Sequence, residues 1–332
     1  MNRRVLIPAE IHPDAPPAGS TVHSLTGDSM GCSWSLRLAA ASPALDALRN
    51  AIQAELDQIV AEMSHWEPES TLCRFNHAPA GSRHRLPPRF AQVMDAALAL
   101  ARQTGGAYDP AAGALVNAWG FGPGEAYAKP GYTPPAPAEC AALTQSWALL
   151  DWRAQPGELL QPGGVLLDLS SIAKGYAVDR MAEILLARGY QHFLVELGGE
   201  LRGHGCKPDG QPWWVEVENP PELGEQAALL ALHGLSIATS GDYRRWTEID
   251  GERLSHTLDP RVGRPITHGL ASVSVVHPSC MQADALSTAI NVLGPEAGLR
   301  FAEHLGLPAR LVWRTESGLQ EASSSAWERL AS

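Results

Sequence analysis

The chain has 332 residues and a formal net charge of −11, with 45% hydrophobic and 18% charged residues. This composition is typical of a folded globular protein and excludes a disordered chain. The acidic balance disfavours a nucleic-acid or anionic-membrane partner, because both require clustered lysine and arginine. No run of about 18 apolar residues is present to span a bilayer.

The N-terminal twenty residues carry two arginines but lack the apolar run of about 7–15 residues that a secretory signal needs. Five scattered cysteines contain no Cys-x-x-Cys pair, which favours a reducing compartment over a disulfide framework or a zinc site. We therefore expect a cytoplasmic protein. Its expected divisions are a flexible leader over 1–20, one domain over 21–320 and a C-terminal tail over 321–332.

Apolar residues recur every three or four positions in five segments, and this spacing predicts helices. Ser42 is the predicted cap of the first helix, and Gly105-Gly106 follows the second. In chain order the predicted helices cover 42–63, 88–104, 172–189, 281–293 and 295–305.

Segments rich in β-branched and aromatic residues predict strands. The predicted strands cover 32–40, 165–169, 193–201, 213–218, 227–233, 245–249, 272–276 and 310–313. Between residues 190 and 276 they follow one another through short turns, with Asp250-Gly251 as the clearest hairpin signal. Because strands and helices do not alternate regularly, the pattern predicts an α+β fold.

The first candidate for chemistry is LLDLSSIAKGYAVDR, residues 166–180, where a predicted strand runs into a helix. The exposed N–H groups of a helix start attract phosphate, and Lys174 would strengthen that attraction. Asp168 can accept a hydrogen bond from a ribose, a ring nitrogen or an amide. The structural alternative is a serine-capped helix with an exposed lysine.

A second candidate segment covers 239–269, where polar residues are unusually dense. His256 lies at a predicted strand end, and a lone histidine is more often structural than catalytic. Four ionisable residues in the same segment favour a site instead. They are Asp242, Arg244, Asp259 and Arg264.

In the third segment, ADALSTAINVLG (283–294), Asp284 and Thr288 are four residues apart on a predicted helix, with Ser287 beside them. That spacing puts a carboxylate and a hydroxyl on one helix face, which suits a hard cation such as Mg²⁺. The alternative is an aspartate that offsets the helix dipole. A fourth segment, glycine-rich and aromatic over 105–123, would either wall a planar ring or simply pack.

Eight segments together resemble the family of ApbE-type FAD:protein FMN transferases, over roughly residues 28–314. They occur in the family's order with similar spacing. The segments are DSMGCSWSLRL (28–38), MSHWEPESTLCRFN (63–76), GAYDPAAGALVNAWGFGP (106–123), LDLSSIAKGYAVDR (167–180), FLVELGGELRGHG (193–205), IATSGDYRRW (237–246), LSHTLDPRVGRPITHGLASVSVV (254–276) and ADALSTAINVLG (283–294).

The resemblance implies a single α+β domain related to the T-fold, with mixed or antiparallel sheets flanked by helices. It implies a bacterial, Mg²⁺-dependent enzyme that takes FAD as substrate and breaks its pyrophosphate. FMN is then attached to a threonine or serine hydroxyl of an acceptor protein, and AMP is released. The implied acceptor is a subunit of a redox complex or a flavin reductase.

The same resemblance implies site residues by position. Asp284 and Thr288 match the metal-binding pair, with the Ser171 backbone carbonyl as a further ligand, and this chain has Ser287 where some members have a second aspartate. His256, or a carboxylate near it, is the expected general base, and Asp284 is expected to act in catalysis through the metal. The positions that match FAD contacts are Met30, Ala107, Tyr108, Asp109, Asp168, Lys174 and His256.

Two alternatives share these residues. A Mg²⁺-dependent FAD pyrophosphatase would let water attack, which gives FMN and AMP. A non-catalytic flavin-binding or flavin-delivery protein would bind FAD without metal-dependent turnover, and the intact Asp284–Thr288 pair speaks against it.

Overall fold

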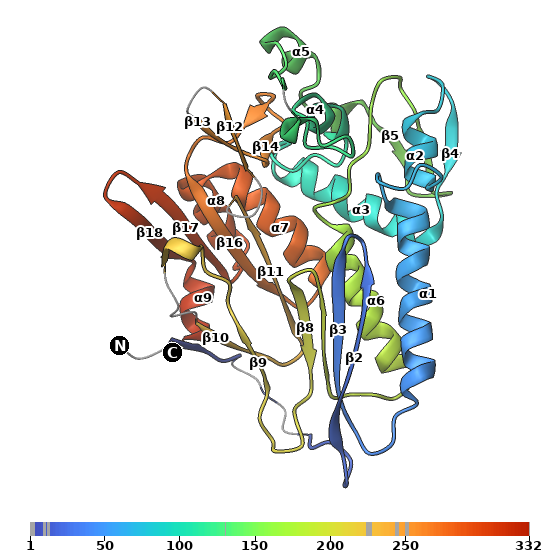
Figure 1. The fold of residues 1–332 in the computed structure, drawn as a ribbon, viewed down its shortest axis with the longest axis vertical. Coiled ribbons are helices and arrows are strands. Elements are labelled where there is room, and N and C mark those ends of the chain that lie inside the picture. Colours follow the sequence, from blue (N-terminus) through green and yellow to red (C-terminus); the bar gives the residue numbers. More distant parts are fainter. Residues whose placement is uncertain are drawn as a thin grey trace. The chain divides into compact units, whose positions relative to one another are not determined.

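The computed structural model describes residues 4–8, 11, 14–129, 131–223, 228–242, 246–249 and 252–331 (Figure 1). The chain divides into two compact units. Unit 1 comprises Met1–Gln58, Lys174–Gly241 and Leu270–Ser332, and unit 2 comprises Ile59–Ala173 and Asp242–Gly269. Each unit combines helices with mainly antiparallel strands, so the predicted α+β class is confirmed. One domain over 21–320 stays a prediction.

Unit 1 is built on an eight-stranded sheet with the strand order β18-β17-β16-β11-β8-β7-β3-β2. Every neighbouring pair in this sheet is antiparallel. The strands are β2 (Thr21–Ser29), β3 (Cys32–Ala40), β7 (Phe193–Leu197), β8 (Glu200–His204), β11 (Leu235–Gly241), β16 (Leu270–His277), β17 (Ala309–Thr315) and β18 (Gly318–Ser323).

Helices pack on one face of this sheet. α7 (Cys280–Leu293) lies against β11 and β16, and α8 (Pro295–His304) lies against β17 (Figure 1). α6 (Ala173–Ala187) belongs to unit 1 from Lys174 onward, and α1 (Leu45–Met63) contributes its residues up to Gln58. Ser279 caps α7, because its side chain accepts a hydrogen bond from the Gln282 N–H.

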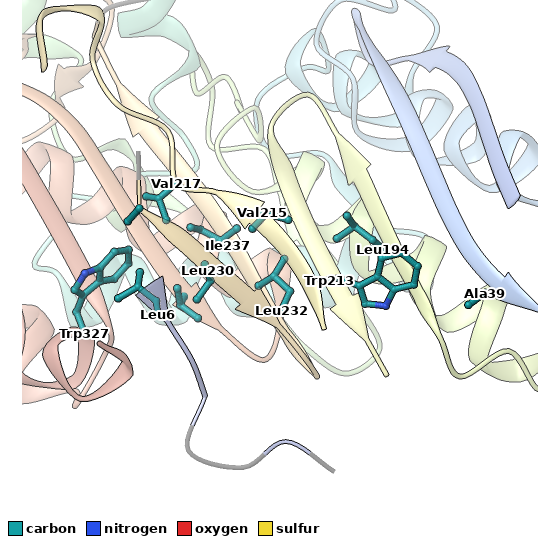
Figure 2. Packing of buried hydrophobic residues seen from close by; sticks show 12 residues of the cluster. Leu6, Ala39, Leu194, Trp213, Val215, Val217, Leu230, Leu232, Ile237 and Trp327 are labelled. Atoms are coloured by element: carbon teal, nitrogen blue, oxygen red, sulfur yellow. The ribbon is translucent and has the colours of Figure 1, made fainter. Parts of the chain in front are cut away.

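An apolar cluster joins the sheet to a second, three-stranded sheet of order β1-β10-β9 and to α9 (Ser325–Leu330). The small sheet consists of β1 (Val5–Leu6), β9 (Trp213–Glu216) and β10 (Leu229–Leu232). Figure 2 shows the side chains of this apolar cluster. Ile237 of β11 lies between Trp327 on one side and Trp213 on the other. Because strand side chains alternate, Ile237 and Ser240 of β11 point to opposite faces.

Both ends of the chain differ from the expected leader and tail. β1 pairs in parallel with β10, and Leu6 is fully buried. At the other end Ser324 caps α9, and Trp327 is fully buried. The sequence pattern missed these elements because each is very short and depends on distant residues for its burial.

Unit 2 is built around α3 (Pro88–Gln103), which buries one apolar face that includes Phe90 and Met94. A three-stranded sheet of order β4-β6-β5 and two two-stranded sheets accompany it. The remaining elements are α2 (Thr71–Asn76), β4 (Arg83–Arg85), α4 (Gly113–Ala118), α5 (Pro137–Ala142), β5 (Asp151–Arg153), β6 (Glu158–Leu160), β12 (Trp246–Ile249), β13 (Glu252–Ser255), β14 (Leu258–Asp259) and β15 (Arg264–Pro265), with short 3₁₀ turns at Ala126–Ala128 and Ser146–Leu149; a third such turn, Pro221–Leu223, is in unit 1.

The five predicted helices are confirmed within a few residues, although the first begins at Leu45. Two strand predictions are wrong. Residues 165–169 form only an isolated bridge, Ala112 to Leu166. Residues 193–201 form two strands, because Gly198 and Gly199 adopt φ values of 61° and 102° and turn the chain.

β12 and β13 pair as the expected hairpin, but the Asp250-Gly251 turn lies outside the described residues, as do Arg244 and Arg245. No helix among the described residues is long and apolar enough to cross a membrane.

Candidate functional site

In unit 1, three charged side chains meet where α6, β8 and α7 come together. The Lys174 ammonium lies 2.5 Å from Glu200 Oε1, and Glu200 is 3% exposed. Asp284 of α7 is 4% exposed, and its Oδ2 accepts a hydrogen bond of 2.9 Å from the Gly175 N–H. A Cβ on Gly175 would lie 2.3 Å from the Cys280 carbonyl oxygen, so glycine is what lets α6 approach α7 this closely.

Burial dominates the electrostatics of this cluster. It raises the pKa of Glu200, and the nearby Asp284 raises it further, while Lys174 lowers it. Burial also raises the pKa of Asp284, against the lowering effects of Lys174 and the Gly175 N–H. The pKa of Lys174 is raised, because the two carboxylates outweigh the burial that opposes its charge.

This arrangement fits a divalent cation. Two buried carboxyl groups face one ammonium group, and Glu200 Oε2 has no hydrogen-bond partner among the described residues. Thr288, one turn beyond Asp284, stays partly exposed and adds a hydroxyl oxygen. Carboxylate and hydroxyl oxygens are the donors that Mg²⁺ prefers.

No group of three or more His, Cys, Asp or Glu side chains is arranged to hold a metal ion in the described part of the chain. A cation at Asp284 would therefore take its other ligands from hydroxyl, carbonyl, water or phosphate oxygens. Mg²⁺ usually binds in this way, through one or two carboxylates together with substrate phosphates and water.

Met30 lies in the tight turn between β2 and β3, with φ of 53°. The turn leads into Cys32, whose pKa is raised by burial and by Glu200 but lowered by Lys174. A Cβ on Gly198 would lie 2.7 Å from Cys32 Sγ and 3.5 Å from Lys174 Cδ. Unit 1 therefore brings the Met30 turn close to the Lys174 cluster.

In unit 2, Asp168 lines a cavity of about 420 Å³. Asp168 Oδ1 accepts a hydrogen bond of 2.9 Å from the Ser170 N–H and lies 3.5 Å from His65 Nδ1. Trp66, 47% exposed, also lines this cavity. The remaining lining includes Asn117, Gly120, Gly122 and Gly124.

Backbone contacts rather than a strand hold Asp168 in place. The Asn76 side chain donates to the Leu167 carbonyl and accepts from the Leu167 N–H, at 3.0 and 2.7 Å. A Cβ on Gly113 would lie 2.7 Å from the Leu166 carbonyl oxygen, so α4 can start here only with glycine. Residues 165–169 are thus fixed by an asparagine and a glycine, and this explains why they do not form the predicted strand.

Ala107, Tyr108 and Asp109 follow α3 and are all buried. Asp109 accepts hydrogen bonds from the Ala111 and Trp147 N–H groups, at 2.8 and 3.3 Å. Burial raises the pKa of Asp109 to about 6, although these N–H groups lower it. The Ser171 hydroxyl donates to the Tyr108 hydroxyl at 3.3 Å, which brings together two of the predicted positions.

His256 lies between β13 and β14 and makes an edge-to-face contact with Phe121, at 6.4 Å between ring centroids. It does not line the cavity that contains Asp168. Within unit 1 the structure therefore brings together Lys174, Asp284 and the Met30 turn, and within unit 2 it brings Tyr108 to Ser171.

Sequence reasoning missed Glu200, His65 and Asn76. The segments FLVELGGELRGHG and MSHWEPESTLCRFN carried the signal, because they belong to the resemblance although no role was predicted for their polar residues. The pairing of Glu200 with Lys174 joins residues 26 positions apart, and no local spacing reveals it.

Comparison with known proteins places the chain in a family. A family model described as the ApbE family matches residues 30–311. A Haemophilus influenzae protein named FAD:protein FMN transferase is 37% identical over 93% of this chain and 91% of its own length. One of the same name from Klebsiella pneumoniae is 35% identical over 93% and 88%.

Among solved structures, the apo crystal structure of the Pseudomonas stutzeri flavinyl transferase ApbE superposes with a TM-score of 0.86 and 37% identity. The superposed region covers 94% of this chain and 97% of the Pseudomonas stutzeri chain. The chain belongs to the ApbE family.

Proposed function

We propose that this protein is a transferase that splits the pyrophosphate of FAD and attaches FMN to a threonine or serine hydroxyl of an acceptor protein. The proposal is supported by relatives named FAD:protein FMN transferase that align with about nine tenths of the chain. The acceptor would be a subunit of a redox complex or a flavin reductase.

The observation that carries the proposal is the buried Asp284 carboxylate beside Lys174, with the Thr288 hydroxyl one turn away. Pyrophosphate chemistry needs concentrated positive charge, and an acidic chain must supply it locally. Asp284, Thr288 and the Ser171 carbonyl would hold Mg²⁺, which when bound neutralises phosphate charge and polarises the P–O bond. Lys174 adds a second positive charge.

The transfer forms one phosphoester bond and breaks one phosphoanhydride bond. The acceptor hydroxyl oxygen forms a bond to the FMN-side phosphorus, and the bond from that phosphorus to the bridging oxygen breaks. AMP leaves, and the hydroxyl proton passes to a general base, for which we propose His256. Met30 and the unit 2 residues Ala107, Tyr108, Asp109 and Asp168 are proposed to position FAD.

The test is incubation with FAD, Mg²⁺ and a candidate acceptor domain. Covalent fluorescent flavin on the acceptor supports transfer, whereas free FMN with AMP supports the pyrophosphatase. FAD binding without AMP supports a binding protein. His256→Asn should abolish transfer even at saturating FAD, and undiminished transfer would remove His256 from the mechanism.

A cytoplasmic location is part of the proposal. All five cysteines are free, and four of them are buried, which suits a reducing compartment. Fractionation of the native host with an antibody to the chain tests this location.

A further inference from the structure

Three hydroxyl groups in unit 1 form a chain that ends on the α7 backbone. Ser287 Oγ lies 2.8 Å from the Asp284 carbonyl oxygen. Ser240 Oγ of β11 lies 2.7 Å from Ser287 Oγ and 3.0 Å from Thr288 Oγ1. Ser287 is fully buried, whereas Ser240 and Thr288 are partly exposed.

The direction of this chain follows from counting protons. Each hydroxyl has one proton to donate and two lone pairs to accept with. A carbonyl oxygen only accepts, so Ser287 must donate to Asp284, and Ser287 must then accept from Ser240. Since the Ser240 proton is used there, Ser240 accepts from Thr288.

Thr288 therefore points its proton at Ser240, and the lone pairs of Oγ1 are left free. A hydroxyl ligand binds a cation through a lone pair, so this orientation is the one a metal ligand requires. Ligands of metal ions are commonly fixed in this way by neighbouring groups that do not touch the metal.

We infer that Ser240 and Ser287 are positioning residues that hold the Thr288 hydroxyl in the orientation required to bind the metal ion. The inference rests on the proposed function only in taking Thr288 as a metal ligand. It gives a role to the serine of IATSGDYRRW and to Ser287, to which the resemblance gives no ligand role.

The protein contains a second hydroxyl pair that serves as a matched control. Thr239, next to Ser240, bonds through its hydroxyl to Ser274 Oγ at 2.9 Å, between the paired strands β11 and β16. Because neighbouring strand residues face opposite ways, this pair lies on the other face of the sheet. Ser274→Ala thus removes a similar hydroxyl pair and leaves the hydrogen bonds among Ser287, Ser240 and Thr288 unchanged.

The experiment measures Mg²⁺ binding to the purified full-length chain by calorimetry, with neither FAD nor acceptor present. Ser240→Ala should weaken Mg²⁺ binding about tenfold. Ser240→Thr, which keeps the hydroxyl, and Ser274→Ala should bind as the unmodified chain does. Ser287→Ala should also weaken Mg²⁺ binding. Without Ser287 as acceptor, the Ser240 hydroxyl can donate to Thr288, and its proton then occupies a lone pair of Thr288 Oγ1 that the metal ion needs.

The loss in Ser287→Ala is the sharper result, since Ser287 acts on Thr288 only through Ser240. If Ser240→Ala does not fold, Ser287→Ala decides the question. Unchanged Mg²⁺ affinity in the folded alanine variants, or no Mg²⁺ binding by the unmodified chain, overturns the inference. FMN transfer by the unmodified chain decides the proposed function separately.

Discussion

Unit 1 places its candidate residues in a buried cluster of opposite charges, whereas unit 2 places Asp168 in a cavity bordered by glycines and Trp66. In the first, burial raises the pKa of both carboxyl groups, whereas the two carboxylates outweigh burial and raise the pKa of Lys174. In the second, backbone contacts from Asn76 and Gly113 decide where the side chain lies. Under the proposed function, unit 1 would handle the phosphate charge and unit 2 would recognise the shape of the nucleotide.

The largest effect should come from Asp284→Ala, which tests the charge-handling role of unit 1. Loss of the buried carboxylate removes the anionic metal ligand, and a bound metal contributes several kcal/mol to the transition state, so FMN transfer should fall about 1000-fold. Transfer is measured by in-gel flavin fluorescence over a Mg²⁺ titration. The control is Asp57→Asn, because Asp57 is an exposed carboxylate on α1. An equal loss of FMN transfer in the two variants would contradict the role of Asp284.

Lys174→Met should destabilise the fold by about 3 kcal/mol, because it leaves Glu200 and Asp284 buried without a cation. A carboxyl group whose folded pKa is raised loses stability as the pH rises from its unfolded value toward its folded value. The penalty should therefore be larger at pH 8 than at pH 5, as measured by urea denaturation. The double variant Lys174→Met/Glu200→Leu should recover most of the loss, and no recovery would mean that the pair is not the cause.

Asp109→Asn tests buried charge in unit 2. The pKa of Asp109 is raised from 3.8 to about 6, so the ionised form is less stable in the fold than in the unfolded chain. Stability of the unmodified chain should therefore fall, relative to the variant, by about 3 kcal/mol between about pH 4 and pH 6. The variant also loses a carboxylate oxygen that accepts a backbone hydrogen bond. This loss lowers its free energy of unfolding by the same amount at every pH. Parallel denaturation curves at every pH would contradict the shift.

Gly113→Ala should have the smallest effect of the four and should act on cavity shape. Its Cβ would lie 2.7 Å from the Leu166 carbonyl oxygen, which should cost about 2 kcal/mol and displace the chain before Asp168. FAD affinity, measured by flavin fluorescence, should weaken. Gly124→Ala is the matched control, because Gly124 lines the same cavity and has no atom within 4 Å of an added Cβ. Equal effects of the two variants would argue against a cavity shaped at Gly113.

Helices were predictable because apolar spacing along 45–63 and 88–103 reflects burial of one face, which is a local signal. The placement of Asp284 and Thr288 one turn apart on α7 was predictable because it depends only on spacing along a helix. Residues 165–169 look like a strand because they are apolar, yet their neighbours are Asn76 and Pro110 rather than another strand.

Partners across long sequence distances were not predictable. Glu200 follows two glycines that turn the chain, and its bond to Lys174 depends on how β8 and α6 pack. Ser240 reaches Thr288 from a strand 48 residues earlier, so only the structure shows the link.

The most direct test of the central claim is a count of products from one reaction with FAD, Mg²⁺ and an acceptor protein. AMP is measured by chromatography, and FMN bound to threonine or serine is measured by mass spectrometry of the acceptor. The account predicts one AMP for each protein-bound FMN, with no free FMN. AMP matched by free FMN, or no AMP at all, would contradict it.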